Sequence, residues 1–220
     1  MDPLNGMFQI IQSQSVRFLK YNRFSSVFPG DLATDFKERY RFVETPQRAV
    51  DFTNTQNGLN FLLGRFGDTT IQKLAIYTNG MLAEGAAPTE ELDLFLDDVL
   101  DIVRKQFDLS TIEGSPVSRL YGSKIEIKST ANLSRALAGL SGIAETLTHA
   151  VTGYGVSARP YQVGGISIVS EKIGDGTITP ARFVFERRAE KPLDDNLFYS
   201  EAPLATKAHV DLIRTLENSL

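Results

Sequence analysis

Two stretches of the chain repeat one order of features: a strand pattern, a Gly-Asp turn, a second strand pattern and the start of a helix. The turns are Gly67-Asp68 and Gly174-Asp175, and the helix starts lie at Thr89 and Thr206. Glycine and aspartate favour tight turns, and a threonine hydroxyl can accept a hydrogen bond from a free backbone N–H at a helix start. Because a hairpin cannot bury its apolar face alone, this order predicts hairpins that are covered by helices.

The repetition has two interpretations, and the sequence leaves both open. One is an internal duplication that makes the halves, about residues 1–110 and 116–220, a pseudo-symmetric pair. The other is chance, because Gly-Asp turns and threonine caps are both common. In either case we predict a single domain over residues 1–220, since no linker-like tract or long block of like charge divides the chain.

The predicted fold class is α+β, with a hairpin-rich antiparallel sheet covered by three main helices. The helices are expected at Thr89–Phe107, Asn132–Val151 and Thr206–Asn218, where apolar residues recur at helical spacing. Asn79-Gly80 predicts a tight hairpin turn, and Phe28–Asp31 predicts a loop. Strands are expected at Met7–Lys20, Glu38–Glu44, Leu59–Leu63, Ile71–Tyr77, Met81–Glu84, Arg119–Ser129, Ile166–Glu171, Ala181–Arg187 and Leu197–Ser200.

Composition excludes several functions. The 220 residues include no cysteine, so disulfides, thiolate metal sites and cysteine nucleophiles are ruled out. The net charge of −4 argues against a dedicated duplex-DNA binder, because phosphate neutralisation supplies much of that affinity. The chain has no apolar run of membrane-spanning length and no signal-peptide pattern, so we expect a cytoplasmic protein with no membrane partner. P-loop and Rossmann motifs are absent, and no cofactor or metal site is expected.

The catalytic candidates are Glu126 and Lys128. Residues two apart on a strand point to the same side, and a carboxylate beside a lysine is typical of Mg²⁺-dependent nucleases. Such sites need a second carboxylate, and the nearest upstream acids, Asp108 and Glu113, lie in a loop-like stretch. An alternating strand also produces this spacing as an ordinary solvent face, and that interpretation is favoured.

The segment 17–48 interleaves basic and aromatic residues, which suits binding of single-stranded nucleic acid. The alternative is a strand pattern whose aromatic residues face the core and whose arginines face water, and it is favoured.

A second charged pattern consists of Asp93, Asp97 and Asp101, which lie one helical turn apart. We interpret them as a solvated helix face and not as a cation site.

The helix expected at Asn132–Val151 is nearly uncharged, which indicates either a central helix or one that lies in a subunit interface. The central position is favoured, and the interface residues of the second interpretation are Leu140, Ser141 and Ala144.

Three arginines near the strand Ala181–Arg187 could form a rim that binds anions or a partner. They are Arg182, Arg187 and Arg188.

The leading functional hypothesis is a non-enzymatic interaction or assembly protein that acts through self-association or a protein partner. It rests mainly on the absence of catalytic motifs and on the uncharged second helix. The alternatives are a Mg²⁺-dependent nuclease built on Glu126 and Lys128, and single-stranded nucleic-acid binding through segment 17–48.

Overall fold

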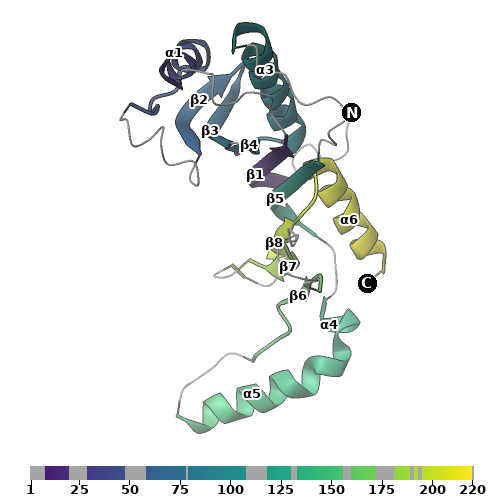
Figure 1. The fold of residues 1–220 in the computed structure, drawn as a ribbon. Helices are drawn as coiled ribbons and strands as arrows, with labels where there is room; N and C mark the ends of the chain where they lie inside the picture. The colour runs from purple at the N-terminus through teal and green to yellow at the C-terminus, as the bar shows by residue number, and fades with distance from the viewer. Residues whose placement is uncertain are drawn as a thin grey trace. The chain divides into compact units, whose positions relative to one another are not determined.

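The computed structural model describes residues 8–19, 29–47, 58–77, 79–107, 118–129, 133–155, 160–171, 181–188, 191–192 and 195–219. Its strands are β1 (Phe8–Phe18), β2 (Leu59–Phe66), β3 (Thr69–Tyr77), β4 (Gly80–Gly85), β5 (Ser118–Lys128), β6 (Gly165–Ile168), β7 (Phe183–Arg187) and β8 (Leu197–Ala202). Its helices are α1 (Pro29–Tyr40), α3 (Thr89–Phe107), α4 (Leu133–Ala136), the 3-10 helix η2 (Ala138–Leu140), α5 (Ser141–Gly153) and α6 (Thr206–Ser219) (Figure 1).

The strands form an eight-stranded antiparallel sheet in the order β2-β3-β4-β1-β5-β8-β7-β6. The α+β class is therefore confirmed. Each predicted strand except Glu38–Glu44 has a counterpart in this sheet. The hairpin expected near Asn79-Gly80 is also confirmed, but Gly80 already pairs with Tyr77 and so lies inside β4.

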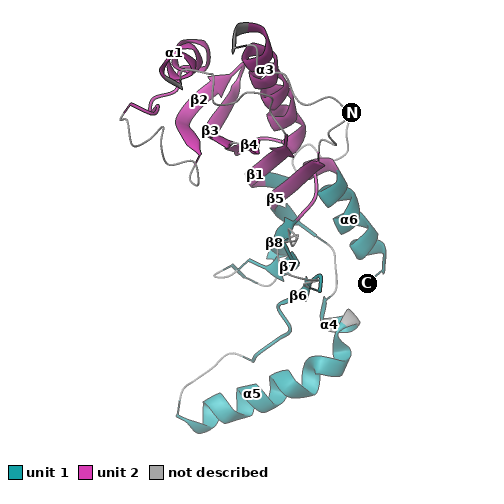
Figure 2. Cartoon of the chain, in the orientation of Figure 1, with its two compact units in different colours: residues 1–9, 125–202, 208–220 teal, residues 10–124, 203–207 magenta. Residues whose placement is uncertain are grey.

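The chain separates into two compact units, coloured in Figure 2. We call residues 10–124 and 203–207 the N-terminal unit, and residues 1–9, 125–202 and 208–220 the C-terminal unit. The first seven residues of strand β5, 118–124, belong to the N-terminal unit, and residues 125–128 belong to the C-terminal unit.

The core of the N-terminal unit forms between α1, α3 and one face of β2–β4 (Figure 1). Leu74 of β3 pairs with Phe61 on one side and with Ala83 on the other, so these three side chains share that face. The ring of Phe36 in α1 lies 5.4 Å from the ring of Phe61. Helix α3 forms as predicted, because its apolar residues follow one stripe and its acidic first turn suits the helix dipole.

The core of the C-terminal unit is smaller and forms around β7 and β8. The rings of Phe185 and Phe198 stack with their centroids 4.5 Å apart. Phe185 pairs with Ser200, and Ser200 contacts His209 of α6, so α6 covers this face of the sheet. Ser200 Oγ donates to the carbonyl of Val184 at 2.7 Å, which leaves it to accept from His209 Nε2 at 2.8 Å.

Among the described residues, one order of elements occurs twice: a strand, a helical region, three strands and a helix, where the helical region is α1 in the first stretch and α4, η2 and α5 in the second. It runs from β1 to α3 and again from β5 to α6. The two stretches also share a hydrogen bond at the end of their first strand. The N–H of Leu19 donates to the carbonyl of Asn79 at 3.0 Å, and the N–H of Ser129 donates to the carbonyl of Asn196 at 3.0 Å.

Two predictions about the first half are wrong. The loop at Phe28–Asp31 and the strand at Glu38–Glu44 give way to helix α1, which begins at Pro29 and ends at Tyr40. Proline is well suited to the first helical position, because its missing N–H would be unpaired there in any case. Of the rest of the expected strand, only Glu44 forms a β-bridge, with Leu62.

The second predicted helix is not continuous. Helix α4 ends at Ala136, and a 3-10 turn over Ala138–Leu140 separates it from α5. Gly139 and Gly142 lie in or beside this break, and glycine lowers helix stability by about 1 kcal/mol relative to alanine. The favoured interpretation of a central helix is wrong for α5, because none of its residues is buried.

Candidate interaction site

Helix α5 presents an apolar stripe that remains exposed. Leu140, Ile143 and Leu147 are 44%, 66% and 47% exposed, and Ala144 lies half-buried beside them. Their spacing of three and four residues places them on one side of the helix. A helix with such an uncovered stripe and few charges is a candidate surface for contact with another protein.

A shallow groove lies along this stripe. It has a volume of about 220 Å³ and is lined by Leu140, Ile143, Ala144, Leu147, Tyr161, Gln162 and Val163. The chain that leads into β6 forms its second wall, which is held by a hydrogen bond of 2.8 Å from the N–H of Tyr161 to Thr148 Oγ1. Both walls belong to the C-terminal unit, so the groove is a feature of that unit alone.

The predicted interface residues are only partly brought together. Leu140 and Ala144 line the groove, whereas Ser141 donates its hydroxyl to the carbonyl of Ala138 at 2.7 Å and closes the turn before α5. Sequence reasoning missed Ile143, which is the most exposed member of the stripe. Its spacing from Leu140 and Leu147 was the signal that could have identified it.

The catalytic candidates lie at the end of β5. Glu126 is half-buried and forms an ion pair with Arg188 at 3.1 Å, and Lys128 is exposed. Asp108 and Glu113 lie outside the described residues. Among the residues that the structure does describe, no group of three or more His, Asp or Glu side chains could hold a metal ion.

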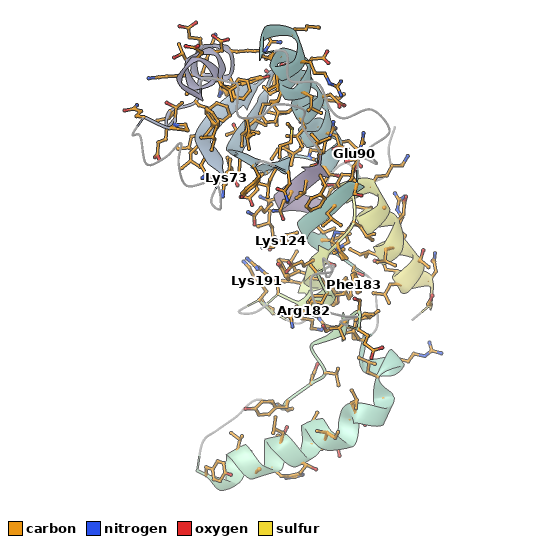
Figure 3. All side chains as sticks on the ribbon, viewed as in Figure 1. Lys73, Glu90, Lys124, Arg182, Phe183 and Lys191 are labelled. Atoms are coloured by element: carbon orange, nitrogen blue, oxygen red, sulfur yellow. The ribbon has the colours of Figure 1, made fainter. Side chains whose placement is uncertain are left out.

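The three arginines of the predicted rim have different surroundings. Arg188 contacts Glu126, as given above, and the guanidinium of Arg187 lies over the ring of Phe198 at 5.2 Å. Arg182 is exposed beside Phe183 at the start of β7, where Figure 3 labels both residues. Arg182 and Arg187 line a common hollow of about 320 Å³ with β6, which Arg188 does not line.

Two arginines of segment 17–48 lie in ion pairs with α3. Arg39 binds Asp98 through two hydrogen bonds of 3.0 and 2.7 Å, and Tyr40 donates to the same carboxylate at 2.8 Å. Burial opposes ionisation of Asp98, but these hydrogen bonds prevail and lower its pKa. Tyr40 and Phe42 are buried in the core and so are not accessible for base stacking. Lys20, Arg23 and Arg48 lie outside the described residues.

Arg17 is the centre of a buried polar cluster in the N-terminal unit. It is 1% exposed and contacts the carboxylates of Asp93 and Asp97. Asp93 also accepts hydrogen bonds from Ser15 Oγ at 2.7 Å and from Tyr121 Oη at 2.8 Å. The hydrogen bond from Arg17 lowers the pKa of Asp97. The predicted solvated acidic face is therefore wrong at Asp93, although Asp97 is exposed.

Comparisons with known proteins identify no family. The sequence matches no protein family, and no curated protein matches it. Among solved structures, it is similar to Methanococcus jannaschii TBP, with 12% sequence identity over 96% of this chain and 96% of that chain and a TM-score of 0.48. This similarity is too distant to assign a function. Within the described part of the chain, no helix is long and apolar enough to cross a membrane.

Proposed function

We propose that the chain is an interaction or assembly protein that self-associates through the apolar face of α5. The observation that carries this proposal is the exposure of Ile143 and Leu147 on a helix with no buried residue. Full burial of a leucine or isoleucine side chain contributes about 1.5–3 kcal/mol, so two half-exposed residues per copy leave a substantial driving force.

The charge distribution supports a protein partner for this face. The residues that line the groove include no charged side chain. The charged residue of the helix, Glu145, and its histidine, His149, lie outside this lining. An uncharged centre with polar surroundings is the usual composition of a protein interface.

The exchange of Leu147 for glutamate tests the proposal. A charge placed in an apolar contact must be desolvated without a partner, so Leu147→Glu should weaken self-association by at least about 100-fold. His149→Glu is the matched control, because it introduces the same residue at an exposed position of α5 outside the groove. We expect wild type and the control to sediment as a concentration-dependent oligomer and Leu147→Glu as a monomer. A wild-type monomer at every concentration would rule the proposal out.

We also infer that the two halves of the chain are a pseudo-symmetric pair. The repeated order of elements and the equivalent hydrogen bonds at Leu19 and Ser129 support this inference. The threonine at the start of α3 and the threonine at the start of α6 support it further. An experimental structure in which β1–α3 and β5–α6 do not superimpose would reject it.

The nuclease hypothesis has less support. Its glutamate, Glu126, forms an ion pair with Arg188, and the described residues contain no group of three or more His, Asp or Glu side chains that could hold a metal ion. Cleavage of nucleic acid with Mg²⁺ that is abolished by Glu126→Gln would revive this hypothesis.

A further inference from the structure

Helices α1 and α5 have the same apolar spacing, although one is buried and the other is not. In each helix four apolar residues follow the pattern i, i+1, i+4 and i+8. They are Leu32, Ala33, Phe36 and Tyr40 in α1, and Ile143, Ala144, Leu147 and Val151 in α5. Both helices connect the first strand of their half to the next strand described.

The two stripes differ in what covers them. All four residues of α1 are buried, and Phe36 is 0% exposed. The corresponding residue of α5, Leu147, is 47% exposed. A pattern that is typical of a helix packed on a sheet is thus present in α5 without the sheet contact.

The strand that would receive such a helix, β6, is also incompletely covered, although Phe183 and Phe185 of β7 on the same face are buried. Phe36 packs on Phe61 of β2, which pairs with the central strand residue Leu74. The corresponding pair in the C-terminal unit is Ile166 of β6 with Phe185 of β7. Ile166 is only half-buried, and Ile168, which lies two residues further along on the same face, is 61% exposed.

We propose that α5 of one copy packs on the exposed β6 edge of this face, at Ile166 and Ile168, in a second copy, and that the second copy returns the contact. This proposal rests on the self-association proposed above and names the surface that α5 meets. The contact of α1 with β2 is its template. A second copy can cover both exposed surfaces without disturbing the hydrogen bond from Tyr161 to Thr148, which holds α5 beside its own chain.

Thiol cross-linking between two variants tests this contact, because the wild-type chain has no cysteine. Leu147→Cys and Ile166→Cys are prepared as separate full-length proteins, mixed, and treated with a short bis-maleimide. The expected product is a cross-linked heterodimer of the two variants. His149→Cys mixed with Ile166→Cys is the matched control, and we expect at least a tenfold lower yield of heterodimer from it.

The alternative outcomes separate this inference from the proposed function. Cross-linked Leu147→Cys homodimers without the heterodimer would mean that α5 packs on α5, which overturns the inference and leaves self-association in place. An intrachain cross-link in the Leu147→Cys/Ile166→Cys double variant, without heterodimer from the mixture, would place α5 on its own sheet and overturn the inference. No cross-link together with a monomeric mass in light scattering would overturn both proposals.

Discussion

Thr89 and Thr206 cap each other. The N–H of Thr206 donates to Thr89 Oγ1 at 2.8 Å, and the N–H of Thr89 donates to Thr206 Oγ1 at 3.0 Å. Both residues are buried, so neither N–H can bond to water instead. Each threonine therefore supplies the acceptor that the start of the other helix needs.

Replacing either threonine with valine should destabilise the fold by a similar amount. Valine keeps the shape but removes the hydroxyl, so one buried N–H loses its acceptor at a cost of about 1–3 kcal/mol. Thr89→Val and Thr206→Val should each lower the free energy of unfolding in urea by that amount. The matched controls, Thr89→Ser and Thr206→Ser, retain the hydroxyl and should recover most of the loss. Equal stability of the valine and serine variants would contradict the reciprocal capping.

His209 should make stability depend on pH. Burial lowers the pKa of His209 to about 4 from its usual value of 6.5. The unfolded state therefore binds a proton between these values while the folded state does not. This contribution to stability is complete above pH 6.5 and is lost as the pH falls to 4, by about 3 kcal/mol in total.

The comparison with His209→Leu isolates this effect. Leu92 lies three residues after the start of α3, as His209 does in α6, and it is buried in the core. Between pH 7 and pH 4, the free energy of unfolding in urea should fall less for the variant than for wild type. Parallel pH profiles would show that His209 does not titrate as described.

Arg17 and Asp97 should differ greatly in their effect on stability although they contact each other. Arg17→Met leaves the half-buried Asp93 without its buried cation and should destabilise by about 3–5 kcal/mol. Asp97→Asn should have an effect below about 1 kcal/mol, because the Asp97 side chain is 59% exposed. Thermal unfolding of both variants measures the difference. Equal losses of stability in the two variants would mean that the ion pair of Arg17 with Asp93 is not its main stabilising contact.

The sequence predicted the sheet well because strand patterns and turn residues are local signals. Strand β1 illustrates the limit of that reasoning. Its existence was predicted from Phe8, Ile10, Val16 and Phe18, but the face that meets α3 carries Ser13, Ser15 and Arg17. Ser15 and Arg17 are buried because Asp93, far away in the sequence, supplies their partner, and the partner of Ser13 is the equally distant Thr206. No local pattern contains that information.

The helices show the same division between local and distant causes. α3 and α6 were predicted from their caps and stripes. α1 was missed because Glu38–Glu44 also alternates like a strand, and only packing of Phe36 on Phe61 decides between the two structures. The low charge of α5 was recognised, but whether it faces a core or a partner depends on surfaces that the sequence does not reveal.

Amide hydrogen exchange of α5, measured as a function of protein concentration, tests the proposed self-association most directly. An exposed helix exchanges through local opening, and a partner that covers its apolar face reduces that opening. We expect exchange in Ser141–Gly153 to slow by at least about tenfold as the concentration rises through the dissociation constant, while α3 serves as the internal reference. Exchange in α5 that is the same at every concentration would contradict the proposal.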